Sequence, residues 1–437
     1  MRALKIILAV VLSVTALCLA LFAGFILLDP VVGTEQPPVT LDTDHIFVPQ
    51  EPEATAQEEE PAPELPEEEL PPVEEEEVPA EPVEDEAVTF AKAYAENMTL
   101  EEKIWQLFFV TPESLTGVNQ ATLAGETTKK SLEARPVGGI VYFAKNLEDK
   151  EQVQKLLSGT QSFSKTPLFL GVDEEGGLVS RVGGNEAIGT TLHPAAAEIG
   201  KTADMKTAYD TGAAMAAELR ELGFNMNFAP VADIITEPEN TEIGSRAYSS
   251  DPETAAAMVS ATVRGLQQNG MVSCLKHFPG HGSTKADSHE GTSVSVRTVD
   301  ELQENEWVPF RAGIEQGAAF VMLSHLTNEN LSENPASLSV EVGAYLRQEL
   351  KFEGIVITDS LQMGAIVDHY QSGEAAVMAL WAGADMLLMP NDLQKAYDAV
   401  HTAVEAGALT EERITESVER IIATKYRFGM IREETAQ

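Results

Sequence analysis

Short apolar runs alternate with amphipathic helical patterns along the chain from Thr89 onward. Apolar runs of four or five residues bounded by polar or glycine positions are typical of buried strands. Eight such strands are expected, at residues 107–110, 139–143, 168–172, 225–228, 272–275, 320–323, 355–358 and 386–389. The segments between them, such as 150–162, 205–222 and 252–268, have helical periodicity. Eight strand–helix alternations predict an α/β fold, a parallel sheet closed into a (β/α)₈ barrel of the TIM type.

Polar and ionisable side chains directly follow several of the predicted strands. In a barrel of this kind the carboxyl ends of the strands lie on one face, and that face carries the active site. The residues in these positions are Asp173 after the third strand, Asp233 after the fourth, Lys276 and His277 after the fifth, His325 after the sixth and Asp359 after the seventh. Their occurrence at one end of the strands predicts a functional site there.

Three residues at or near the predicted strand ends, Asp359, Asp287 and His289, have the chemistry of nucleophilic or acid–base catalysis. Asp359 follows an apolar strand that would hold its carboxylate rigidly, although its position is equally consistent with a helix N-cap. Asp287 and His289 are two residues apart in a loop, so the carboxylate can orient the imidazole for proton transfer. The alternative for this pair is a solvated loop without function.

Basic residues near the strand ends have structural alternatives as well. Lys276 could pair with a buried carboxylate for purely structural reasons. Arg181 and Arg246, each taken alone, could be ordinary surface residues, and Met363 is expected to pack in the interior.

Five ordered motifs carry a resemblance to a known family. They are KHFPGHG at 276–282 followed by DSH at 287–289, DEEGGLVSR at 173–181, NFAPVAD at 227–233, IGSR at 243–246 and ITDSLQMGA at 357–365. Together they resemble the family 3 glycoside hydrolases, specifically their bacterial β-N-acetylglucosaminidase branch, over about residues 90–430. The residues after His289 depart from the pattern: they read Glu290-Gly291-Thr292 where the family frequently has Leu-Pro, which leaves the geometry of that loop open.

The resemblance implies a retaining exo-β-N-acetylglucosaminidase that acts on terminal non-reducing β-GlcNAc and needs no cofactor or metal. Asp359 would be the nucleophile that forms a covalent glycosyl-enzyme, and His289, oriented by Asp287, the acid and then the base. The residues expected to bind the sugar are Asp173, Arg181, Arg246, Lys276 and His277. The expected substrates are peptidoglycan fragments (muropeptides) or chitooligosaccharides, as in peptidoglycan recycling.

Three other functions stay open. A β-glucosidase or β-xylosidase of the same family differs only in the sugar. A metal-dependent barrel hydrolase would ligate zinc through His277, His281, Asp287 and His289, although the first strand offers no further ligand. A non-catalytic wall-binding module would require the loss of Asp359 or His289, and both are present. The sequence does not determine the oligomeric state or whether phosphate can replace water as acceptor.

Three segments with different composition divide the chain. Residues 1–28 hold Arg2 and Lys5 and then a long apolar run, which predicts one N-terminal transmembrane helix, with a cleaved signal as the alternative. Residues 29–88 are rich in Pro and Glu, which predicts a disordered acidic linker. Residues 89–437 form the expected catalytic barrel, placed outside the cytoplasm and anchored to the cell membrane, or secreted if the segment is cleaved. The net charge of −41 makes nucleic acid an unlikely partner.

Overall fold

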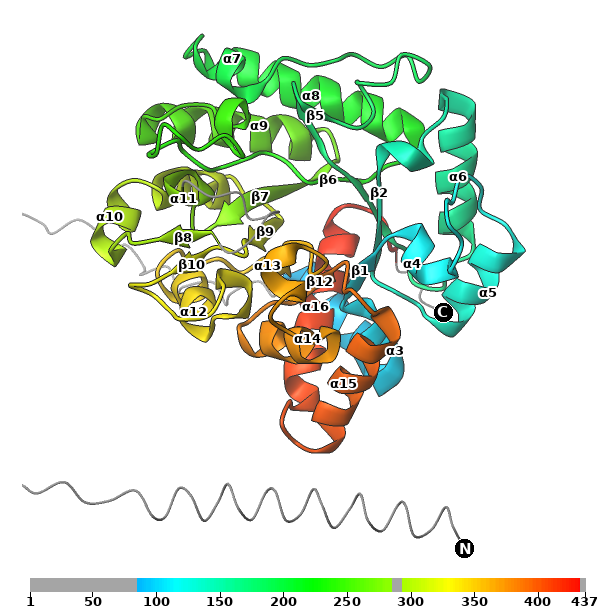
Figure 1. Ribbon diagram of the computed structural model, residues 1–437. Coiled ribbons are helices and arrows are strands. Elements are labelled where there is room, and N and C mark those ends of the chain that lie inside the picture. The colour runs from blue at the N-terminus through cyan, green and yellow to red at the C-terminus, as the bar shows by residue number, and fades with distance from the viewer. Residues whose placement is uncertain (1–84, 285–292, 433–437) are drawn as a thin grey trace, which may run out of the picture. The chain divides into compact units, whose positions relative to one another are not determined.

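A barrel of parallel strands surrounded by helices forms the centre of the computed structural model, which describes residues 85–284 and 293–432 (Figure 1). Its eight strands are β1 (Phe108–Val110), β2 (Gly139–Tyr142), β3 (Phe169–Val172), β6 (Met226–Asn227), β7 (Val272–Phe278), β9 (Phe320–Leu323), β11 (Ile355–Thr358) and β12 (Leu387–Leu388). Their order is β11-β9-β7-β6-β3-β2-β1-β12, and all neighbouring pairs are parallel. A parallel bridge between Ile357 and Met386 joins the two ends of this sheet, so the barrel is nearly closed.

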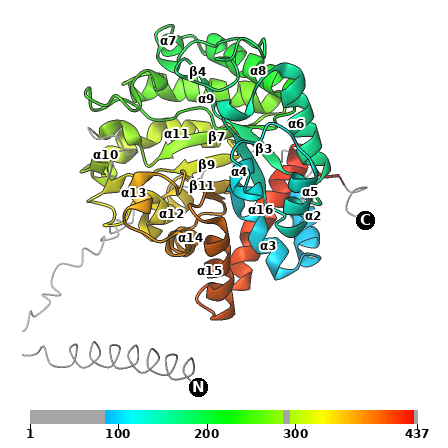
Figure 2. The same ribbon diagram turned by 45° about the vertical axis from the view of Figure 1, so that its right-hand side comes forward.

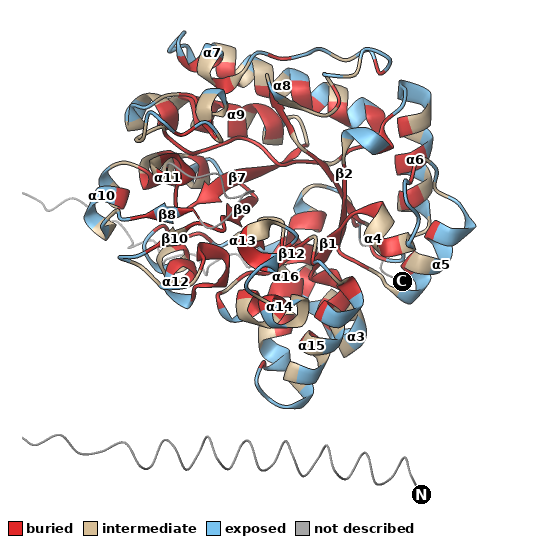
Figure 3. Cartoon of the chain, viewed as in Figure 1, coloured by how far each residue is buried: buried red, intermediate tan, exposed pale blue. Residues whose placement is uncertain are grey.

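Helices cover the outside of the barrel (Figure 1 and Figure 2). They are α2 (Glu86–Glu96), α3 (Leu100–Gln106), α4 (Pro112–Thr116), α5 (Glu126–Ala134), α6 (Lys150–Ser162), α7 (Ala196–Gly200), α8 (Met205–Leu222), α9 (Pro252–Gln268), α10 (Val299–Glu304), α11 (Trp307–Glu315), α12 (Val340–Gln348), α13 (Gly364–Val367), α14 (Ser372–Trp381), α15 (Leu393–Glu405) and α16 (Glu411–Arg427). Their inner faces are buried and their outer faces exposed (Figure 3). This distribution matches the helical periodicity of the sequence.

Short elements at the carboxyl ends of the strands complete the fold. The strands β4 (Glu174–Gly176) and β5 (Val179–Ser180) form an antiparallel hairpin after β3. A parallel pair, β8 (Val294–Ser295) and β10 (Thr327–Asn328), lies after β7 and β9. The four 3₁₀ turns of the described residues are η1 (Ala144–Asn146), η2 (Gly244–Arg246), η3 (His281–Ser283) and η4 (Ala336–Leu338).

Aromatic side chains fill the interior of the barrel. The rings of Phe109 and Phe228 meet edge to face at 5.3 Å, and those of Phe169 and Phe320 at 5.2 Å. Gly171 leaves the space that these rings need, because a Cβ there would lie 2.8 Å from the Phe228 ring and 3.0 Å from the Phe109 ring. The interior is therefore packed rather than hollow, and it forms a solid support for side chains at the strand ends.

The eight predicted strands are all present. The fifth is longer than expected, since β7 continues through Lys276 and His277 to Phe278. The apolar pattern ends at Leu275, but the side chains of the next two residues are paired inside the barrel: Lys276 donates to Asp173 and His277 lies against the buried Asp233. The barrel thus fits the TIM type.

The transmembrane helix that the fold prediction placed before the barrel needs correction. It falls within residues 1–28, outside the described residues. Of the helices in residues 85–284 and 293–432, none is both long enough and apolar enough to cross a membrane. The fold formed by residues 85–284 and 293–432 therefore includes no transmembrane helix. The proposed boundaries of the three segments stay a prediction.

Candidate active site

A cavity of about 320 Å³ opens at the carboxyl ends of the strands. Six of the residues predicted to act there line it: Asp173, Arg181, Arg246, Lys276, His277 and Asp359. Asp173, Lys276, His277 and Asp359 lie at the carboxyl ends of β3, β7 and β11. Arg181 directly follows β5, and Arg246 is the last residue of the 3₁₀ turn η2. The structure therefore brings together residues that lie up to 186 positions apart, from 173 to 359.

Asp359 lies directly after β11 and is partly buried. Its backbone N–H donates to the carbonyl of Leu323, and its Oδ1 accepts a 2.6 Å hydrogen bond from the N–H of Ser360. Burial raises the pKa of this carboxyl, but its neighbours His325 and His277 and the Ser360 N–H outweigh burial and lower the pKa below its ordinary value. Asp359 is thus an ionised carboxylate that faces the cavity, as a nucleophile requires.

The alternative of a helix cap at Asp359 is wrong. The next helix, α13, begins at Gly364 and has Met363 as its N-cap residue. Met363, which the sequence predicts to pack rather than to contact substrate, is partly buried and lines the cavity.

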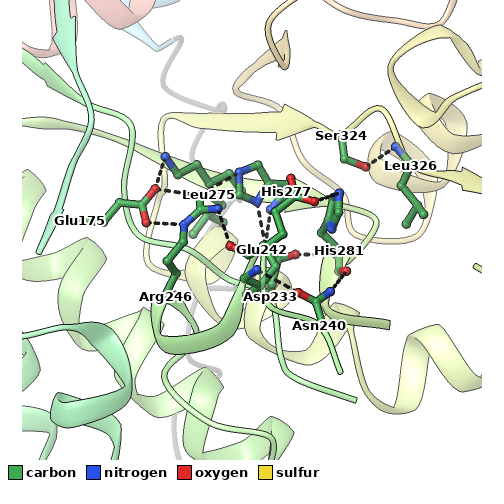
Figure 4. Close-up of polar contacts among 12 residues, drawn as sticks. Glu175, Asp233, Asn240, Glu242, Arg246, Leu275, His277, His281, Ser324 and Leu326 are labelled. Carbon is green, nitrogen blue, oxygen red and sulfur yellow. Dashed lines mark hydrogen bonds and ion pairs between the residues drawn. The ribbon is translucent and has the colours of Figure 1, made fainter. Parts of the chain in front are cut away.

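Glu175 holds two of the cations on one wall of the cavity. Its Oε2 and Oε1 accept hydrogen bonds of 2.8 and 2.9 Å from Arg246, and its Oε1 lies 2.6 Å from Nζ of Lys276. Lys276 also donates to Oδ1 of Asp173 at 2.8 Å. Burial raises the pKa of Glu175, yet the charges of Lys276 and Arg246 prevail and lower it to about 2. Figure 4 shows Glu175 facing Arg246.

His277 has a buried carboxylate behind it. Its Nδ1 lies 2.7 Å from Oδ2 of Asp233, and its Nε2 lies 3.4 Å from a guanidinium nitrogen of Arg246 (Figure 4). Asp233 is 1% exposed, whereas His277 reaches the cavity. Lys276 and Arg246, for which the sequence left a purely structural or surface role open, therefore belong to one hydrogen-bonded network in the wall of the cavity.

Arg181 contributes a further donor to the cavity. Its side chain is partly buried, and its Nε has no hydrogen-bond partner among the described residues. A guanidinium with an unused donor at the edge of a cavity is suited to a polar ligand.

Apolar side chains also line the cavity. Phe143, Met363 and Met389 come from the loops after β2, β11 and β12, and Val179 belongs to β5. The cavity thus combines charged and apolar side chains, which suits a sugar, because a pyranose carries hydroxyls at its edge and C–H groups on its faces.

The predicted pair Asp287 and His289 lies outside the described residues. The residues that flank this gap are held together, because the hydroxyls of Ser283 and Ser295 are 3.0 Å apart. Ser283 belongs to η3, which follows the cavity-lining end of β7.

Sequence reasoning missed Glu175 and Asp233 as site residues. Glu175 had a signal, because it stands two positions after Asp173 in an extended segment and such residues point the same way. Asp233 had only its place after the fourth strand. Within residues 85–284 and 293–432, no three His, Cys, Asp or Glu side chains form a group that could hold a metal ion.

The family model "Glycosyl hydrolase family 3 N terminal domain" matches residues 99–424. The chain is 33% identical over 299 residues to a β-hexosaminidase of Nitrosomonas eutropha, covering 64% of this chain and 84% of that protein. It is 37% identical over 268 residues to the β-hexosaminidase LpqI of Mycobacterium tuberculosis, covering 59% and 68%. A solved family 3 β-N-acetylglucosaminidase from Paenibacillus is similar with a TM-score of 0.71 and 35% identity, over 78% of this chain and 67% of that one.

These matches, together with a charged cavity at the carboxyl ends of a parallel barrel, define a glycosidase. The chain belongs to glycosyl hydrolase family 3.

Proposed function

We propose that this enzyme is a retaining exo-β-N-acetylglucosaminidase. It removes terminal non-reducing β-GlcNAc from muropeptides or chitooligosaccharides. The observation that carries the proposal is the meeting of Asp359 with the Asp173–Lys276–Glu175–Arg246 network in one cavity. The names of the relatives, β-hexosaminidase and β-N-acetylglucosaminidase, support N-acetylglucosamine as the sugar.

The reaction proceeds in two displacements. The ionised Asp359 attacks the anomeric carbon and forms a covalent glycosyl-enzyme, while His289, oriented by Asp287, protonates the departing oxygen. His289 then removes a proton from water, whose oxygen bonds to the anomeric carbon as the bond to Asp359 breaks, and the sugar leaves with its original anomeric configuration. Retaining glycosidases generally use two carboxylates, and here an imidazole takes the place of the second.

The charged wall binds the hydroxyls and the acetamido group. Asp173 accepts hydrogen bonds from hydroxyls, and Lys276, Arg246 and Arg181 donate to oxygens of the sugar. Because Lys276 and Arg246 are each held by Glu175, they donate from fixed positions and lose little rotational freedom on binding. A cavity of about 320 Å³ suits a single terminal residue, which supports exo action.

The location that we propose is outside the cytoplasm. The basic N-terminal residues followed by an apolar run support export, and cell-wall glycans are then the polymers within reach.

The test compares aryl β-glycosides on the purified protein. The aryl β-N-acetylglucosaminide is hydrolysed with a kcat/KM well above those of the aryl β-glucoside and β-xyloside, and NMR of the first product shows the β-anomer. A preference for the glucoside or xyloside would overturn the choice of sugar, and the α-anomer as first product would overturn retention. Release of internal fragments from a chitooligosaccharide would overturn exo action.

A further inference from the structure

Asp233 is a buried carboxylate that accepts three hydrogen bonds, all from one short segment of the chain. It follows β6 and is 1% exposed. Its Oδ2 accepts from the backbone N–H of His277 at 3.1 Å and from the ring at 2.7 Å, and its Oδ1 accepts from the backbone N–H of His281 at 2.7 Å (Figure 4). All three donors belong to residues 277–281, so this one side chain fixes both the backbone and the ring of His277.

The two neighbours of the His277 ring determine which nitrogen carries the proton. A carboxylate only accepts hydrogen bonds, so Nδ1 carries a hydrogen directed at Asp233. A guanidinium only donates, so Nε2, 3.4 Å from Arg246, presents its lone pair. Of the two neutral tautomers, the one with the proton on Nδ1 therefore fits this site, because its acceptor Nε2 lies on the side of Arg246 and the cavity.

The ionised state of Asp233 agrees with this arrangement. Burial raises the pKa of its carboxyl, but the contacts with His277 and His281 outweigh burial and keep the pKa below its ordinary value.

We infer that Asp233 is a positioning residue, which fixes the tautomer and orientation of His277 so that the single lone pair of Nε2, 3.4 Å from Arg246 in the structure, can accept from a substrate hydroxyl in place of the guanidinium. The inference rests on the proposed function for the identity of that hydroxyl, which belongs to the sugar. Cations dominate this wall of the cavity, and His277 adds an acceptor to it beside Asp173. Asp233 itself touches no substrate.

A direct measurement on the unaltered protein tests the tautomer. ¹⁵N NMR of histidine side chains distinguishes a protonated from an unprotonated ring nitrogen, and His277→Gln identifies the signal of His277. We expect a protonated Nδ1 and an unprotonated Nε2. The opposite tautomer, or a doubly protonated ring, would overturn the inference. The NMR measurement does not depend on enzymatic activity. Failure of the proposed function would be seen separately, as absent hydrolysis of β-N-acetylglucosaminides by the wild type.

A double-mutant cycle tests whether Asp233 acts through His277. In Asp233→Asn one oxygen is left for three N–H donors, so the amide NH₂ opposes either the ring and backbone N–H of His277 or the N–H of His281, and the segment that holds the ring shifts. We expect kcat/KM for the aryl β-N-acetylglucosaminide to fall on the order of 10²-fold in Asp233→Asn. In the His277→Gln background the same change has little further effect, because coupled residues are not additive. Equal losses in both backgrounds would mean a structural role and would overturn the inference.

The matched control is another buried carboxylate on the barrel. Asp385 is 0% exposed and accepts hydrogen bonds from the N–H of Val356, from Ser417 and from two arginines, outside the residues that line the cavity. Asp385→Asn lowers the unfolding temperature but leaves KM and kcat close to wild type. If Asp385→Asn reduced kcat/KM as strongly as Asp233→Asn, loss of a buried carboxylate alone would explain both, and the positioning role would be refuted.

Discussion

At the scale of the residue, the site depends on the buried carboxylate of Glu175. Glu175 faces both Lys276 and Arg246, so these two cations have one counter-ion in common. Removing one partner of a buried ion pair leaves the others uncompensated, which costs more than the pair contributed.

We therefore predict that Glu175→Gln destabilises the protein by about 3 kcal/mol and lowers kcat/KM on the order of 10²-fold. The loss arises because Lys276 and Arg246 repel each other and shift from their positions. Thermal unfolding and steady-state kinetics on the aryl β-N-acetylglucosaminide measure the two effects.

The neighbouring Glu174 is the control for this change. It is also buried, but its carboxylate bonds to Ser180 and to the N–H groups of Val182 and Gly183 and does not line the cavity. Glu174→Gln should leave kcat/KM within a few-fold of wild type. If the two variants had the same kinetics, the counter-ion role of Glu175 would be wrong.

At the scale of the element, helix α16 buries a lysine that pairs with no carboxylate of residues 85–284 and 293–432. Lys425 is 0% exposed, its Nζ donates to Oε1 of Gln106 at 2.8 Å, and the Phe169 ring centre lies 5.0 Å away. Burial lowers the pKa of Lys425 to about 7.

The pH dependence of stability follows from this lowered pKa. Between about pH 7 and 10 the unfolded chain binds a proton at Lys425 that the folded protein does not, so stability rises with pH through this range. One group contributes roughly 1.4 kcal/mol per pH unit there. We predict that Lys425→Met removes this part of the slope, as measured by denaturant unfolding at pH 7 and pH 9.5. An unchanged slope would mean that Lys425 stays charged in the folded protein.

The secondary-structure elements also show which parts of the fold the sequence can predict. The eight strands are predictable because each is a short apolar run that the barrel buries on both sides. The pairs β4–β5 and β8–β10 are not, because two or three residues carry no periodicity and the pairs form only where tertiary contacts bring them together. For the same reason the sequence shows Lys276 and Arg246 as separate basic residues. That both residues pair with Glu175 can be seen only once β3 and β7 are placed around the barrel.

At the scale of the whole molecule, the barrel gathers the strand ends into one charged cavity with no metal site among residues 85–284 and 293–432. The sequence alternative of a zinc-dependent hydrolase makes a different prediction from the glycosidase. We expect hydrolysis of the aryl β-N-acetylglucosaminide to continue undiminished after exhaustive dialysis against a chelator. Loss of activity that added zinc restores would favour the metal-dependent alternative.

The central claim is that Asp359 becomes covalently attached to the sugar. The most direct measurement traps this intermediate with a slowly released fluorinated β-N-acetylglucosaminide and locates it by peptide mass spectrometry. The account predicts one added sugar residue on the peptide that contains Asp359, none in Asp359→Ala, and unchanged labelling in the control Asp368→Ala, whose carboxylate is exposed after α13. Turnover by Asp359→Ala should fall at least about 10³-fold. An adduct on another residue, or near wild-type turnover by Asp359→Ala, would contradict the account.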